Sequence, residues 1–263
     1  MKITVLIENT ACDKELTAEH GLSLYIETSD KTVIFDSGQS EHFAENAQKL
    51  GVDLKKVDIA VLSHGHYDHS GGFLRFLEIN DKARIYMNEN VFGNHLNRTG
   101  KYIGVDQKLQ KSDRITLTND EYHIDDSLTL YTLNDMTPKY PVDSAGLSVD
   151  IGGKISADTF RHEHYLLIED EGKKVLISGC SHKGILNIEN RFEPDYLIGG
   201  FHFIDVSMDA KGQERLKEAA NELLSYRTVY YTGHCTGAEQ FEYMKKIMGE
   251  RLERIYTGRT ISI

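Results

Sequence analysis

The amino-acid sequence predicts a layered α/β (α+β) protein assembled from two half-units. Runs of β-branched or alternating apolar residues, typical of strands, fall into two groups, and apolar residues at helical spacing follow within each group. No fixed-period repeat and no low-complexity linker divides the chain. Because 263 residues suffice for one large core, we expect a single domain over residues 1–263.

The first half-unit is expected to contain four strands and one helix. A turn at residues 29–31 separates the second strand from the third, which indicates a hairpin. Apolar side chains recur at helical spacing over residues 41–50, and Gly51 is a natural stop for that helix. The expected strands are residues 2–7, 22–28, 32–35 and 57–62.

The second half-unit follows a strand at residues 83–87 and a polar stretch over residues 88–126. Since this stretch has only weak periodicity, we interpret it as an insertion. Beyond it the strand pattern resumes, and two amphipathic helices flank the last expected strand. These strands are residues 128–132, 165–168, 175–178, 196–198 and 229–231, and the helices are residues 213–224 and 239–248.

Composition excludes several classes of function. The chain carries 30 Lys and Arg against 41 Asp and Glu, a net charge of −11, which excludes a nonspecific nucleic-acid binder because such a protein needs a basic surface. Apolar runs are too short to cross a membrane, and residues 1–8 resemble a first strand more than a signal peptide. Three widely spaced cysteines, Cys12, Cys180 and Cys235, indicate no disulfide framework and a reducing cytoplasm.

One short segment concentrates side chains that bind metals. His64, His66, Asp68 and His69 lie within six residues, directly after the strand expected at residues 57–62. In an extended segment His64 and His66 point to the same side and can share one cation. Asp68 and His69 can turn toward a second cation, and the glycines that follow allow a close turn into a helix. A loop of surface histidines is the alternative interpretation.

Imidazole together with carboxylate is the usual ligand mixture for zinc or iron. We therefore expect two divalent metal ions, with zinc as the first candidate and iron or manganese as alternatives.

The motif His-x-His-x-Asp-His resembles the signature of the metallo-β-lactamase superfamily. Asp36, in Phe-Asp-Ser-Gly, resembles the Asp-x-Gly that this family places upstream, and His234 resembles its late histidine at the second metal. The glycine-rich segments around Cys180, His202 and Cys235 resemble a branch similar to 7,8-dihydropterin-6-methyl-4-(β-D-ribofuranosyl)-aminobenzene-5'-phosphate synthase. The resemblance implies a four-layer αβ/βα sandwich.

The resemblance also implies two sets of metal ligands. One set is His64, His66 and His182; the other is Asp68, His69 and His234.

The third ligand of the first set is the position where alternatives remain. The family often has a bridging Asp after the strand that here ends before Gly179-Cys180. Either Cys180 supplies a thiolate at that place or His182 completes the first site, and we favour His182, with Cys180 outside the ligand set. His162 and His164, just before a strand, compete for the same position or face solvent.

Other polar residues are assigned supporting roles. Asp36 is expected to orient a metal-bound histidine. Asp68 and His202 are the catalytic candidates: Asp68 can take a proton, and His202 enters the cleft either to act on substrate or to make a structural hydrogen bond. The remaining histidines have no clustered partners in the sequence and are interpreted as ordinary surface or core residues; they are His20, His42, His95 and His123.

A basic run stands out in this acidic chain. It consists of Arg98, Lys101, Lys108, Lys111 and Arg114. Since aspartates interleave it, a solvated face is one interpretation. The other is a lid that holds an anionic substrate over the metals.

The leading functional hypothesis is a metal-dependent hydrolase that attacks a small, anionic or phosphorylated molecule with a metal-activated water. The alternative implied by the resemblance is a transferase that condenses a pterin diphosphate with an aminobenzene ribofuranosyl phosphate. A metal-holding sensor or redox protein is a third hypothesis, since fold does not decide function. A small molecule is the expected partner, and neither nucleic acid nor a membrane is; the oligomeric state stays open.

Overall fold

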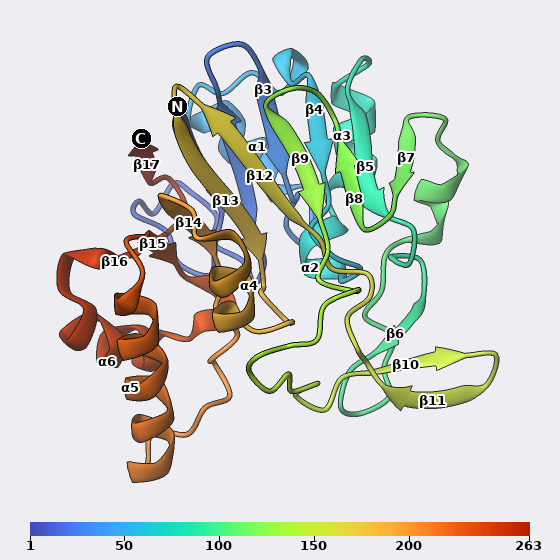
Figure 1. Ribbon diagram of the computed structural model, residues 1–263. Coiled ribbons are helices and arrows are strands. Elements are labelled where there is room, and N and C mark those ends of the chain that lie inside the picture. Colours follow the sequence, from blue (N-terminus) through green and yellow to red (C-terminus); the bar gives the residue numbers. More distant parts are fainter.

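The protein is a four-layer sandwich, described by a computed structural model of residues 1–263. Two seven-stranded sheets pack face to face, and helices cover the outer face of each (Figure 1). This arrangement confirms the layered α/β fold with two half-units that the sequence predicts.

The first sheet changes from antiparallel to parallel pairing at its middle. Its first four strands pair antiparallel and its last four pair parallel, with β3 belonging to both groups. In spatial order the strands are β17 (Thr260–Ser262), β1 (Lys2–Ile7), β2 (Ser23–Glu27), β3 (Thr32–Phe35), β4 (Ile59–Val61), β5 (Arg84–Asn88) and β7 (Ile115–Thr118).

The second sheet repeats this design. Its strands pair antiparallel as far as β13 and parallel from β13 onward. From the antiparallel edge they are β8 (Glu121–His123), β9 (Leu128–Tyr131), β12 (Tyr165–Asp170), β13 (Lys173–Gly179), β14 (Tyr196–Gly199), β15 (Val229–Thr232) and β16 (Leu252–Arg254). In each half the carboxyl ends of the parallel strands lie at one edge of the sheet.

Helices pack on the outer faces because each carries an apolar stripe. Phe43 of α1 (His42–Lys49) and Phe76 of α3 (Phe73–Ile79) are buried in the cluster outside the first sheet. On the other side α4 (Ile185–Phe192), α5 (Ala210–Ser225) and α6 (Ala238–Met248) cover the second sheet. The sequence analysis did not predict α3 or α4, which span seven and eight residues. Such short apolar segments fit a strand as well as a helix.

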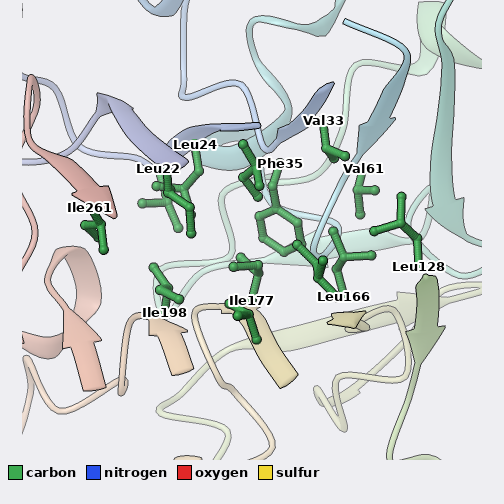
Figure 2. Close-up of a cluster of buried hydrophobic side chains, with 14 of the residues drawn as sticks. Leu22, Leu24, Val33, Phe35, Val61, Leu128, Leu166, Ile177, Ile198 and Ile261 are labelled. Carbon is green, nitrogen blue, oxygen red and sulfur yellow. The ribbon is translucent and has the colours of Figure 1, made fainter. Parts of the chain in front are cut away.

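The central core lies between the two sheets. Phe35, Val61 and Leu24 of the first sheet face Ile177 and Leu166 of the second, and all five are fully buried (Figure 2). Burial of apolar surface at roughly 25 cal/mol per Å² makes this layer the main stabilising contact between the halves.

The segment 88–126, interpreted as an insertion, contributes strands to both large sheets and to a third sheet of three strands. Its strands β7 and β8 form the outer edges of the first and second sheets. Its strand β6 (Asn94–Leu96) pairs with β10 (Ser148–Ile151), which forms a hairpin with β11 (Lys154–Ala157). The hairpin projects beyond the sandwich (Figure 1).

The short helix α2 (Tyr67–Ser70), which carries part of the histidine motif, and four short 3₁₀ helices complete the list. None of the helices combines the length and apolarity that a bilayer crossing requires.

Replacing Ile177 by Ala should test the central layer. Ile177 is fully buried between the sheets, so the lost contacts and the cavity should lower the free energy of unfolding by about 2–5 kcal/mol. Ile151 of the projecting hairpin is 72% exposed, and Ile151→Ala should change it by less than about 0.5 kcal/mol. Urea denaturation measures both; equal losses would contradict this account of the core.

Candidate metal centre

The candidate site lies where parallel strands of both sheets end. Asp36 follows β3, and the motif from His64 to His69 follows β4. In the second sheet, Cys180 and His182 follow β13, while His202 and His234 follow β14 and β15. The carboxyl ends of parallel strands commonly form the binding crevice of α/β proteins. The fold therefore gathers side chains from residues 36 to 234 at one place.

The backbone at this edge is locally strained. Asp36, Ser181, His202 and His234 have φ values of 60°, 60°, 56° and 51°, in the left-handed region that non-glycine residues rarely adopt. They make up four of the eight such residues in the chain. Each conformation costs about 1–3 kcal/mol and persists only where surrounding contacts hold it, so the strain marks a functional edge.

A first group contains His64, His66 and His182. One ligand atom from each lies within 4.8 Å of the others, and Nε2 of His64 is 3.3 Å from Nε2 of His182. Nε2 of His66 is buried without any hydrogen-bond partner. Burial and the neighbouring histidines hold the pKa of all three well below the ordinary value. The rings are therefore neutral, which is the form that binds metals.

A second group contains Asp68, His69 and His234. The Nε2 atoms of the two histidines are 3.1 Å apart, and Oδ2 of Asp68 lies 3.6 Å and 3.5 Å from them. Burial raises the pKa of Asp68, but His69 and His234 lower it more strongly, so the carboxyl stays ionised. Burial likewise lowers the pKa of His69, yet the carboxylates of Asp36 and Asp68 bring it above the ordinary value. The group is an environment that favours a cation.

Cys180 lies between these two groups. Its Sγ is 3.2 Å from Nε2 of His69 and shares the 4.8 Å neighbourhoods of both His64 and His234. Burial raises the pKa of the thiol well above its usual value, so a nearby cation would have to displace the proton. The structure thus places His182 and Cys180 together in the site, although the sequence analysis favoured only the first as a ligand.

Acceptor oxygens behind the histidines assign their tautomers. Asp36 is fully buried and accepts hydrogen bonds from Ser63 N at 2.7 Å and Ser63 Oγ at 2.7 Å. It also accepts one from Nδ1 of His69 at 2.6 Å. Because the hydroxyl proton of Ser63 points to Asp36, its oxygen accepts from Nδ1 of His64 at 2.8 Å. Both rings therefore carry a proton on Nδ1 and direct Nε2 to the site, as expected for Asp36 as an orienting residue.

His234 is held in the same way from the N-terminal loop. Its Nδ1 donates to Oδ1 of Asn9 at 3.0 Å, and its backbone N donates to Oε1 of Glu8 at 2.6 Å. Nε2 of His69 and Nε2 of His234 then face one another at 3.1 Å. Two ring nitrogens at that distance need a proton or a metal ion between them, so the donor set fits a metal ion.

Glu163 holds the loop that carries His182. This buried carboxylate accepts hydrogen bonds from the backbone N of His182 at 2.7 Å and of Lys183 at 3.0 Å. It also accepts from the hydroxyl of Tyr165 at 2.6 Å. Burial raises the pKa of Glu163, although these three donors oppose the shift.

The structure does not use His162 or His164 as the third histidine of the first group. His162 accepts at Nδ1 from Gly65 N at 2.9 Å and donates from Nε2 to Asp158 at 3.2 Å. Although His162 and Asp158 lie within reach of His66, their polar atoms are thus already paired. His164 contacts Thr118 Oγ1 at 3.4 Å and belongs to none of the ligand groups.

Two of the four histidines interpreted as having no clustered partners lie beside buried carboxylates, whereas His42 and His123 pair with Glu45 and Glu121 at the surface. Nε2 of His20 is 3.3 Å from Oδ2 of Asp68, and Nδ1 of His95 is 2.9 Å from Oδ2 of Asp158. Sequence reasoning also missed Glu8, which lies 226 residues from its partner His234. These contacts arise only when separate loops fold over the same edge, and no local pattern announces them.

His202 and part of the basic run border a neighbouring cavity of about 680 Å³. The ring of His202 lies 4.4 Å from that of His182, and Arg98 pairs with Asp205 at the same wall. The other basic residues lie elsewhere. Arg114 donates to the carbonyl of Leu77 at 2.8 Å. Three exposed lysines do not line this cavity; they are Lys101, Lys108 and Lys111.

This chain is similar to known proteins in sequence and in architecture. Across 290 aligned positions the chain is 28% identical to 7,8-dihydropterin-6-methyl-4-(β-D-ribofuranosyl)-aminobenzene-5'-phosphate synthase of Methanocaldococcus jannaschii, covering 99% of this chain and 96% of that protein. A crystal structure described as a metal-dependent hydrolase of the β-lactamase superfamily is 26% identical. It superposes with a TM-score of 0.81 over 100% of this chain and 99% of that one.

A more distant structure shares the fold. Zinc-bound PqqB from Methylobacterium extorquens has 12% identity and a TM-score of 0.59, with both chains fully covered. The sequence model of the metallo-β-lactamase superfamily matches residues 16–234 of this chain. The match spans the histidine motif and every group of the candidate site, and the chain belongs to the metallo-β-lactamase superfamily.

Proposed function

We propose that this protein is a metal-dependent hydrolase of a small, anionic, phosphorylated substrate, with two divalent ions as cofactors and zinc as the first candidate. The observation that carries the proposal is the convergence of histidine nitrogens on two adjoining positions, one of which includes an ionised carboxylate. Such a mixture of imidazole and carboxylate suits zinc. The relatives described as a metal-dependent hydrolase and as zinc-bound support both parts.

His64, His66 and His182 would hold one ion, and Asp68, His69 and His234 the other. Cys180, between the two groups, would supply a further donor atom, its thiolate. When bound, two such ions lower the pKa of a water molecule and polarise the phosphoryl or carbonyl group that it attacks.

The chain's own residues would orient the reaction. Asp36 holds the proton of His69 on Nδ1, and Glu163 fixes the backbone of His182. Asp68, an ionised carboxylate at the second position, would take a proton from the nucleophile. His202, at the wall of the neighbouring cavity, is placed to bind substrate or to protonate a leaving group.

A transferase is the second candidate, and the full-length similarity to the Methanocaldococcus jannaschii synthase favours it. The two reactions differ in the atom that enters the product. A hydrolase incorporates one oxygen from solvent, whereas a transferase needs a second substrate and incorporates none. Turnover of ester, thioester, lactone and phosphodiester substrates in ¹⁸O-labelled water, followed by mass spectrometry, distinguishes them; label-free product would contradict hydrolysis.

A cytoplasmic location belongs to the same proposal. All three cysteines are free, and two of them, Cys180 and Cys235, are buried at the site, where a reducing compartment would preserve them.

The double substitution His66→Ala and Asp68→Ala should empty the centre, because it removes one ligand from each position. Metal content should fall below about a tenth of the parent's, while the folded sheets remain. Elemental analysis and far-ultraviolet circular dichroism measure the two. As the control, His123→Ala removes an exposed histidine and should leave metal content unchanged. Full metal content in the double variant would refute the assignment.

Cobalt substitution should detect Cys180 in the ligand set. Because its Sγ is 3.2 Å from His69 Nε2, the cobalt protein should show a thiolate charge-transfer band. Cys180→Ala should abolish the band and Cys12→Ala, which removes an exposed thiol, should preserve it. His182→Ala should lower metal affinity by at least about ten-fold. A cobalt protein without the band would show that Cys180 is not a metal ligand.

A further inference from the structure

A second cavity adjoins the metal centre on the side of α4. It measures about 730 Å³ and lies between the loop of residues 133–144, the end of β11 and the first turns of α4. Lys183, the residue after His182, forms part of its wall, and so does Asp158, which lies beside His66. The cavity therefore reaches the surroundings of the first group of histidines.

Lys183 is a basic side chain in a buried position at the wall of this cavity. It is only 9% exposed, and its Nζ donates to Oδ1 of Asn134, a neutral group. No carboxylate lies within 4.0 Å of this ammonium group, although the chain contains 41 Asp and Glu. Glu163 accepts the backbone N–H of Lys183 and not its ammonium. The ammonium group thus forms no direct ion pair, and the carboxylates of Glu163, Asp120 and Asp158 attract it only from beyond 4.0 Å.

The energetics of burial make this arrangement informative. A buried ammonium loses several kcal/mol of hydration and is normally compensated by an opposite charge. Here the direct hydrogen-bond partner is the amide of Asn134, and two further amides line the cavity together with Asp143 and Asp158. Asn187 donates to the carbonyl of Tyr140 at 3.0 Å, and Asn190 accepts from Lys139 at 3.2 Å. These amides satisfy backbone and surface groups, so an anion bound in the cavity would be the first charged group in direct contact with Lys183.

The other walls of the cavity suit the body of an organic molecule. Leu133, Met136, Pro138 and Val142 supply apolar surface beside the amides. A ligand that carries an anionic group on an apolar or ring-shaped body could place the anion at Lys183 and the body along these residues. Pockets with a few polar groups among apolar walls are typical of small-molecule sites.

We propose that Lys183 is the anion-binding residue of a substrate subsite in this cavity, where it binds a phosphate group of the molecule whose reacting end lies at the metal centre. This inference rests on the proposed function, which concerns the reacting end of the substrate. It adds that the other end of the substrate carries a phosphate group. The anion site proposed here is a single buried ammonium. It replaces the basic run at residues 98–114, three of whose lysines are exposed.

Calorimetric titration of the metal-loaded protein with inorganic phosphate tests the subsite. We expect two classes of phosphate binding, one at the metals and one at Lys183. Lys183→Met should eliminate the second class or weaken it by at least about ten-fold, the value of a hydrogen bond to a charged group, with metal content unchanged. Lys139→Met is the matched control, because Lys139 borders the same cavity but is exposed and pairs with Glu222.

The metal-deficient variant His66→Ala/Asp68→Ala separates the two sites. It should lose the class at the metals and keep the class at Lys183, so this result bears on the subsite alone, whereas the ¹⁸O experiment bears on hydrolysis. Lys183→Gln, which removes the charge and keeps a polar end, repeats the test if the methionine variant fails to fold. Unchanged phosphate binding in the Lys183 variants, or an equal loss in Lys139→Met, would overturn the proposal.

Discussion

The packing of two sheets with the carboxyl ends of their parallel strands at one edge is the constraint on which the site depends. Phe35 and Ile177 are buried between the sheets, and they fix the ends of β3 and β13 relative to each other. Asp36 follows the first of these strands and Cys180 the second, so the positions of site residues derive from the central core. A site assembled in this way needs no long-range motif, because a few residues after each strand are enough.

The hydrogen bonds behind the metal-facing atoms matter as much as the ligands themselves. A histidine can present either nitrogen, and an oxygen acceptor at Nδ1 leaves Nε2 free. Asp36, Ser63 and Asn9 do this for three rings, while Glu163 holds a fourth through its backbone. The strained φ values at Asp36 and His234 belong to the same design, since these contacts hold backbone conformations that an isolated loop would abandon.

Local patterns explain which parts of the molecule the sequence could predict. The histidine motif occupies six consecutive positions, and the buried strands carry near-continuous apolar runs, so both are visible without a structure. The edge strands β7 and β8 were not, because their side chains are only partly buried and their hydrophobic pattern is weak. Likewise, Glu8 and His20 reach the site across more than forty residues of intervening chain, and no spacing rule connects them with Asp68 or His234.

The location of positive charge follows from the acidity of the chain. With a net charge of −11, exposed lysines are surrounded by carboxylates and by salt, and their fields are screened within about 10 Å. A buried ammonium acts in a medium of lower dielectric constant, so its attraction for an anion is stronger and is confined to the cavity it lines. Lys183 meets this condition and the exposed basic run does not. An acidic protein can therefore select a small anion by burying one cation beside its metal centre, because the surrounding negative surface repels larger polyanions.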